Sequence, residues 1–278
     1  MTTFAGSDGT LLAYRRVGTG PRLVCVPGGP GRASEYLEDL GGLSTQRTLV
    51  LLDNRGTGAS AMPADRSTLR FDHLADDLEA LRLHLGEDTL HVLGHSAGAV
   101  VAQVWAARHP ERVASLTLVT PSDKLQGGRR DDLDEIRARR SSEPWYADAA
   151  EAVKALATAG AADAQVLWRR VRPFFYGRWD DRVRAHAWSA EAQTSPEAEH
   201  GWGRGAERVD VPGIVSKLHA VRAPVRVIGG EHDAITGVRS VELVAHSFPN
   251  ATTRVLAGAG HFPWVDAPEA FVRAALDA

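Results

Sequence analysis

Short apolar runs alternate with longer segments of helical periodicity over the first 120 residues. Residues 71–85 place leucine at positions 74, 78, 81 and 85 and stop before Gly86, which predicts a helix. Short, apolar runs that predict buried strands lie at 23–26, 48–52, 90–93 and 116–119. Strands that alternate with helices favour a mainly parallel sheet with helices on both of its faces.

The same rhythm extends to both ends of the chain. Residues 2–17 predict two short strands around a turn at Ser7-Asp8-Gly9. After position 223 the pattern predicts a strand at 224–228, a helix at 238–248, a strand at 253–256 and a last helix at 268–276. The sequence therefore predicts an α/β fold with a mostly parallel, eight-stranded sheet.

The middle of the chain departs from this alternation of strands and helices. Residues 121–205 are helix-like, rich in arginine and alanine, and hold five of the seven tryptophans. We interpret them as a helical cap inserted into a core formed by residues 1–120 and 206–278. Most cap aromatics are expected to form the cap's own core, but a lid needs an apolar underside. The candidates for substrate binding are Trp145, Phe174, Phe175 and Trp179.

Composition narrows the function classes. A formal net charge of −3 without a long basic run argues against nucleic-acid binding. The sequence has no run of about 18 apolar residues for a membrane span and no signal peptide at its start, so we expect a cytoplasmic protein. Cys25 is the single cysteine and cannot form an internal disulfide. Because no cluster has metal-ligand spacing and no glycine-rich loop fits a nucleotide, we expect neither a metal nor a cofactor. The oligomeric state stays open.

Ser96 lies between two glycines at the junction of a predicted strand and a predicted helix. The stretch Gly94-His95-Ser96-Ala97-Gly98 fits a sharp turn that carries a nucleophile at its tip, because the flanking positions must be small. A plain structural serine beside glycines is the alternative. The helical apolar face that follows favours the nucleophile.

A serine nucleophile needs a histidine base and an acid that orients the histidine. Two candidates lie after later strands, where the carboxyl ends of parallel strands meet: Asp233 and His261. Asp123, after the 116–119 strand, is the main rival acid, and Glu231 ranks lower. The alternatives without a catalytic role are a helix N-cap at Asp233 and a surface loop histidine at His261. His95 is expected to be structural or to line the pocket.

The negative oxygen that forms during acyl transfer needs two N–H donors. One candidate is the backbone N–H of Ala97, directly after the nucleophile. The second should come from the loop VPGGPG at 26–31, in which Pro27 and Pro30 have no N–H. Gly28 or Gly29 must therefore donate.

Five motifs carry a family resemblance: VPGGPGRASEYLEDL, LLDNRGTGAS, GHSAG, GGEHDAITG and GAGHFPWVDAPEAF. Together they resemble the α/β-hydrolase superfamily, and its prolyl aminopeptidase (proline iminopeptidase) branch in particular. The order Ser96, Asp233, His261 is similar to that family's order of nucleophile, acid and base. The resemblance implies Gly29 as the oxyanion donor, and Asp53 and Arg55 as structural supports.

Three positions depart from the peptidase pattern. Pro27 replaces a histidine, Ala97 replaces a bulky aromatic residue, and Ala234 replaces an acid that binds the substrate's free amine. Acids that could substitute for it are Glu197, Glu199 and Glu207. We therefore expect a serine hydrolase that cleaves an ester or amide of a small, partly apolar molecule or short peptide through an acyl-enzyme. Two alternatives are a lyase, cyclase or cofactor-free oxygenase that uses the His-Asp pair, and a non-catalytic binding protein.

Overall fold

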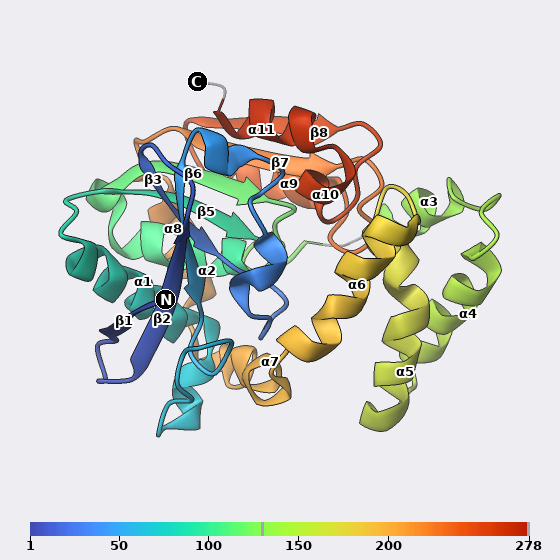
Figure 1. The fold of residues 1–278 in the computed structure, drawn as a ribbon, viewed down its shortest axis with the longest axis horizontal. Coiled ribbons are helices and arrows are strands. Elements are labelled where there is room, and N and C mark those ends of the chain that lie inside the picture. The colour runs from blue at the N-terminus through green and yellow to red at the C-terminus, as the bar shows by residue number, and fades with distance from the viewer. Residues whose placement is uncertain (129–130, 277–278) are drawn as a thin grey trace.

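The computed structural model describes residues 1–128 and 131–276 and contains one eight-stranded sheet (Figure 1). The strands are β1 (Thr2–Ala5), β2 (Leu11–Val17), β3 (Arg22–Val26), β4 (Thr48–Asp53), β5 (Leu90–His95), β6 (Val113–Val119), β7 (Val225–Gly230) and β8 (Ala251–Leu256). Their order across the sheet is β1-β2-β4-β3-β5-β6-β7-β8. Of the strand pairs in the described part of the chain, β1–β2 and β2–β4 are antiparallel and the other five are parallel. The predicted mostly parallel, eight-stranded α/β fold is confirmed.

Alternate residues of each central strand point to opposite faces of the sheet, and both faces are covered. The helices are α1 (Phe71–Leu85), α2 (Ala97–Arg108), α3 (Leu133–Ala138), α4 (Tyr146–Leu156), α5 (Ala161–Val171), α6 (Asp181–Gln193), α7 (Pro196–Trp202), α8 (Val211–Leu218), α9 (Arg239–Ala245), α10 (Pro263–Asp266) and α11 (Pro268–Leu276). Val24 and Val26 pack with α1, α2, α8 and α9, whereas Cys25 packs with α10 and α11. No helix of the described residues could serve as a membrane span.

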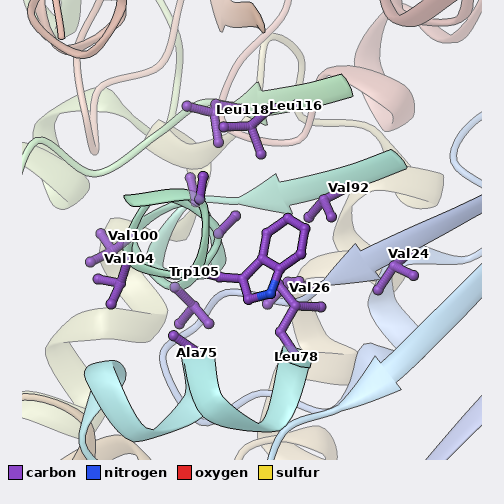
Figure 2. Close-up of a cluster of buried hydrophobic side chains, with 14 of the residues drawn as sticks. Val24, Val26, Ala75, Leu78, Val92, Val100, Val104, Trp105, Leu116 and Leu118 are labelled. Atoms are coloured by element: carbon purple, nitrogen blue, oxygen red, sulfur yellow. The ribbon is translucent and has the colours of Figure 1, made fainter. Parts of the chain in front are cut away.

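Trp105 of α2 lies at the centre of the first of these two packed faces. Figure 2 shows its ring directed toward Val26 of β3 and Leu78 of α1. The indole Nε1–H donates to Glu79 Oε2 at 3.1 Å, so the buried ring keeps its polar atom paired. This packing fixes α2, and with it the junction that carries Ser96.

The chain between β6 and β7 is helical, and α3 to α6 lie to one side of the sheet (Figure 1). Helices α3 to α5 share a small apolar cluster that includes Ile136, Val171 and Phe174, together with Ala234 from the chain after β7. By contrast, α8 packs against α2 and the first face of the sheet. The division into a cap at 121–205 and a core on either side of it stays a prediction.

Candidate active site

Ser96 lies at the tip of a sharp turn between β5 and α2. Its backbone has φ 53° and ψ −116°, a region that a residue with a side chain rarely adopts. The Ser96 N–H donates to Val119 O at 2.9 Å, which fixes the turn against β6. A strained turn at this place is what the nucleophile interpretation requires.

The glycines on both sides of Ser96 leave no room for a side chain. A Cβ at Gly98 would lie 2.3 Å from Val26 O, and one at Gly94 would lie 2.7 Å from Gly98 O. Both contacts are with backbone, which cannot move away without distorting β3 or α2. The turn therefore depends on these two glycines for its close packing.

Gly98→Ala should destabilise the protein, because the added methyl group overlaps the backbone of β3. We expect a loss of about 1–3 kcal/mol in the free energy of unfolding, measured by urea denaturation. Gly203→Ala is the matched control, since no atom of residues 1–128 or 131–276 lies within 4 Å of a Cβ there. Equal stability of the two variants would contradict the packing argument.

His261 and Asp233 form a buried pair. His261 Nδ1 lies 3.0 Å from Asp233 Oδ2, and both side chains are almost wholly buried. Asp233 Oδ1 accepts the N–H groups of Ile235 and Thr236, and the Thr236 hydroxyl donates to Oδ2 at 2.5 Å. Burial acts to raise the pKa of Asp233, but the charge of His261 and these hydrogen bonds outweigh it and lower the pKa. Asp233 is thus held as a carboxylate facing the imidazole.

The other two candidate acids take different positions. Asp123 is buried and lines the same cavity as Ser96, but His261 Nδ1 is directed at Asp233. Glu231 accepts the N–H of Gly258 at 2.9 Å, and its side chain is 43% exposed. The geometry therefore favours Asp233 as the orienting acid.

A buried chain of hydrogen bonds joins His261 to the loop after β3 through His95. His95 Nε2 lies 2.9 Å from His261 O, a carbonyl that can only accept, so Nε2 carries the proton. Burial lowers the pKa of His95 well below its ordinary value, so its ring is neutral and Nδ1 accepts the Tyr36 hydroxyl at 2.7 Å. The Tyr36 oxygen in turn accepts the Gly28 N–H at 2.6 Å. Sequence patterns could not reveal this series of hydrogen bonds, because Tyr36, His95 and His261 lie far apart along the polypeptide and meet only in the fold.

This series of hydrogen bonds bears on whether Gly28 or Gly29 can donate its N–H to the oxyanion. The Gly28 N–H is already donated to Tyr36. The Gly29 N–H makes no hydrogen bond with any described residue, and Gly29 has φ 121°, a region that favours glycine. Ala97 is the first residue of α2, where the backbone N–H groups have no partner within the helix. Gly29 and Ala97 are therefore the two available donors.

Ser96 and His261 line a cavity of about 850 Å³, a size typical of small-molecule sites. Its described lining residues are Gly29, Pro30, Arg32, Tyr36, His95, Ser96, Ala97, Ser122, Asp123, Lys124, Gly127, Gly128, Trp168, Arg172, Phe175, Tyr176, Ala187, Ala190, Thr194, Glu199, Trp202, Ile235, Thr236, His261 and Phe262. The wall includes several apolar and aromatic side chains.

Of the four predicted substrate-binding aromatics, the structure brings only Phe175 to this cavity among the described lining residues. Phe175 O accepts the His261 N–H at 2.7 Å. Trp145 and Phe174 pack edge to face inside the cap's own core, and Trp179 packs between Tyr176 and Trp188. Trp168 and Trp202 line the cavity instead, which helix periodicity could not reveal without the packing of the cap.

The three acids that could replace the missing amine-binding residue also take different positions relative to the cavity. Glu199 lines the cavity, and partial burial raises its pKa. Glu197 is exposed and pairs with Arg66, while Glu207 is exposed beside Arg208. Glu199 is thus the member of the three that a bound substrate could reach.

Asp53 and Arg55 hold loops rather than face the cavity. Asp53 accepts the N–H and hydroxyl of Ser34, each at 2.8 Å, directly after the glycine loop. Arg55 forms a buried ion pair with Asp77 and a second one with Asp8. These contacts agree with a supporting position for both residues.

The loop after β3 is also bonded to the chain around the end of α6. Ala33 N–H donates to Gln193 O, and Ser195 N–H donates to Gly31 O, both at 2.9 Å. Arg32 and Thr194 form an isolated β-bridge between these two bonds. The segment 31–33 therefore pairs with residues 193–195 like a short strand.

Comparison with known proteins agrees with this architecture. Residues 21–268 match the family described as "alpha/beta hydrolase fold". The match runs from the residue before β3 to the first residue of α11. A proline iminopeptidase from Heyndrickxia coagulans is 33% identical over 104 residues, 37% of this chain. A pimeloyl-[acyl-carrier protein] methyl ester esterase from Chromobacterium violaceum is 29% identical over 95% of this chain and 96% of its own length.

The share of a relative's own length that this chain covers differs between relatives. The chain spans 63% of an acetyltransferase component of the acetoin cleaving system from Cupriavidus necator, at 28% identity, and 36% of the iminopeptidase. Among solved structures, an esterase from Exiguobacterium antarcticum superposes with a TM-score of 0.74 and 17% identity over 98% of this chain and 96% of its own. The resemblance to the iminopeptidase branch is confirmed, and the chain belongs to the α/β-hydrolase fold family.

Proposed function

We propose that this protein is a serine hydrolase that cleaves an ester or amide of a small, partly apolar substrate through an acyl-enzyme. The observation that carries the proposal is Ser96 on a strained turn in the same cavity as the buried His261–Asp233 pair. A binding protein would not need a strained serine beside an oriented imidazole. The curated full-length esterase relative also supports ester cleavage.

In the proposed reaction, His261 Nε2 takes the Ser96 proton as Ser96 Oγ attacks the substrate carbonyl carbon. The N–H groups of Gly29 and Ala97 stabilise the oxygen that becomes negative. His261 then gives its proton to the departing alcohol or amine, and Asp233 holds the imidazole in the required tautomer throughout. A water molecule attacks the acyl-enzyme by the same steps in reverse and releases the acid.

The charges that line the cavity favour an ester over a peptide with a free amine. An aminopeptidase must take an ammonium group out of water and pair it with buried carboxylates. Here Ala234 follows Asp233, where the peptidase pattern has an acid, and the cavity lining includes the buried Arg32. The positive charge of Arg32 would repel an ammonium group bound near it.

Turnover of three substrates tests this proposal: 4-nitrophenyl butyrate, proline 4-nitroanilide and N-acetylproline 4-nitroanilide. We expect the ester to have the highest kcat/KM and the two anilides to be slow and similar. Because esters are intrinsically more reactive, the comparison of the two anilides carries the argument about the amine. If free proline nitroanilide were the best substrate and acetylation abolished its cleavage, the protein would be a peptidase. Glu199 would then be the first amine-binding acid to replace.

A further inference from the structure

Arg32 is a buried cation without a carboxylate partner. Arg32 comes directly after the glycine loop in the sequence and lines the cavity, yet the residue is only 5% exposed. No carboxylate of the described residues lies within 4.0 Å of its guanidinium. A buried charge that stays unpaired is costly, so an unpaired guanidinium in a cavity wall is unusual outside a binding site.

Neutral groups hold the Arg32 guanidinium in place. Nε donates to Gln193 Oε1 at 3.0 Å, and Nη2 donates to His186 O at 3.2 Å and to Ser189 Oγ at 3.0 Å. The central carbon lies 4.3 Å from the centre of the Tyr36 ring. These contacts orient the guanidinium without neutralising it, and burial lowers its pKa.

The second cation of this wall is already neutralised. Arg172 Nη2 lies 3.6 Å from Glu191 Oε1, and Arg172 also donates to Ala187 O. Arg32 and Arg172 both bind carbonyls of α6, and each positive charge disfavours the other. One uncompensated positive charge therefore remains at this part of the wall.

Arg32 is also directly connected to the reacting groups. Tyr36, on which it stacks, accepts the Gly28 N–H and donates to His95. His95 in turn holds His261 O. A ligand group bound by Arg32 would therefore share the cavity with Ser96.

We infer that the substrate of this site carries a carboxylate, and that Arg32 binds it. The inference rests on the proposed hydrolase function in calling the ligand a substrate. The binding of a carboxylate by Arg32 does not depend on that function. A planar carboxylate with one negative charge matches one planar, unpaired guanidinium.

Calorimetric titration of the whole protein with glutaramate, the half-amide of glutarate, and with glutaramide tests this inference without any turnover. The two probes have the same carbon skeleton and differ by one carboxylate. We expect glutaramate to bind at least about tenfold more tightly than glutaramide, as a charge-assisted hydrogen bond implies. Glutaramate should also inhibit hydrolysis of the nitrophenyl ester competitively. Equal affinity of the two probes for the unaltered protein would overturn the inference.

Arg32→Gln should remove the preference for glutaramate, and Arg169→Gln should keep it. Arg169 is the matched control because it lies in the cap, is half exposed and carries the same charge. If Arg32→Gln does not fold, Arg32→Lys tests the same point, since it keeps the charge but loses the planar fork: we expect a weakened preference. A preference that persists undiminished in a folded Arg32 variant would refute the assignment.

The outcomes separate this inference from the proposed function. A protein that prefers glutaramate through Arg32 but hydrolyses no ester would refute the hydrolase proposal and leave the carboxylate site standing. A protein that hydrolyses esters but binds both probes equally would do the reverse.

Discussion

Ser96→Ala and His261→Ala should each lower turnover of 4-nitrophenyl butyrate by several orders of magnitude. The two side chains act as one unit in the proposed mechanism, so losing either one removes most of the rate enhancement, and the double variant should be little worse than the single ones. The measurement is kcat under saturating ester. In the unaltered protein, a labelled fluorophosphonate should modify Ser96.

Ser240→Ala is the control for the loss of a buried serine, because its hydroxyl donates to nearby Gly237 O and, among the described residues, Ser240 does not line the cavity. It should keep full turnover. Failure of the fluorophosphonate to label Ser96 in folded protein would count heavily against the nucleophile. Survival of the native reaction in Ser96→Ala together with its loss in His261→Ala would favour the lyase, cyclase or oxygenase alternative.

Asp233→Asn should lower kcat by about a thousandfold or more, whereas Asp123→Asn should have a far smaller effect. An asparagine at 233 can donate toward His261 Nδ1 and so favours the wrong tautomer of the imidazole. Asp233 Oδ2 is 3.0 Å from that nitrogen in the structure, and its lowered pKa keeps it charged at neutral pH.

Glu231→Gln is the matched control for this pair of variants, since Glu231 lies two residues from Asp233 and binds Gly258 N–H instead. Its turnover should stay close to that of the unaltered protein. A larger loss in Asp123→Asn than in Asp233→Asn would move the orienting acid to the loop after β6.

The sequence predicted those parts of the fold that local pattern determines. The leucine periodicity at 71–85 matches α1 over its whole length, and the short apolar runs fall within strands of the sheet. The presence of Ser96 and His261 in one cavity followed from one rule, that the carboxyl ends of parallel strands share an edge. Residues at the ends of strands are placed by topology, and topology could be predicted from the alternation of elements.

The rest of the site depends on packing between distant segments, which no local pattern encodes. Phe174 and Phe175 are adjacent aromatics on a short turn, yet one is buried in the cap's core and the other lines the cavity. Arg32 resembles an ordinary surface arginine in sequence, but α6 covers it. The bond between His95 and His261 O spans 166 positions of the chain.

The pairing of residues 31–33 with residues 193–195 has a consequence for protein engineering. A chimaera that exchanged the whole of 121–205 for the cap of another family member would cut the bonds of Gly31 and Ala33 to that segment. The loop that carries Gly29 would then lose its lateral support along with the old cap. Junctions placed before Gln193 would retain this support, so the transferable portion of the insertion ends within α6, short of its sequence boundary.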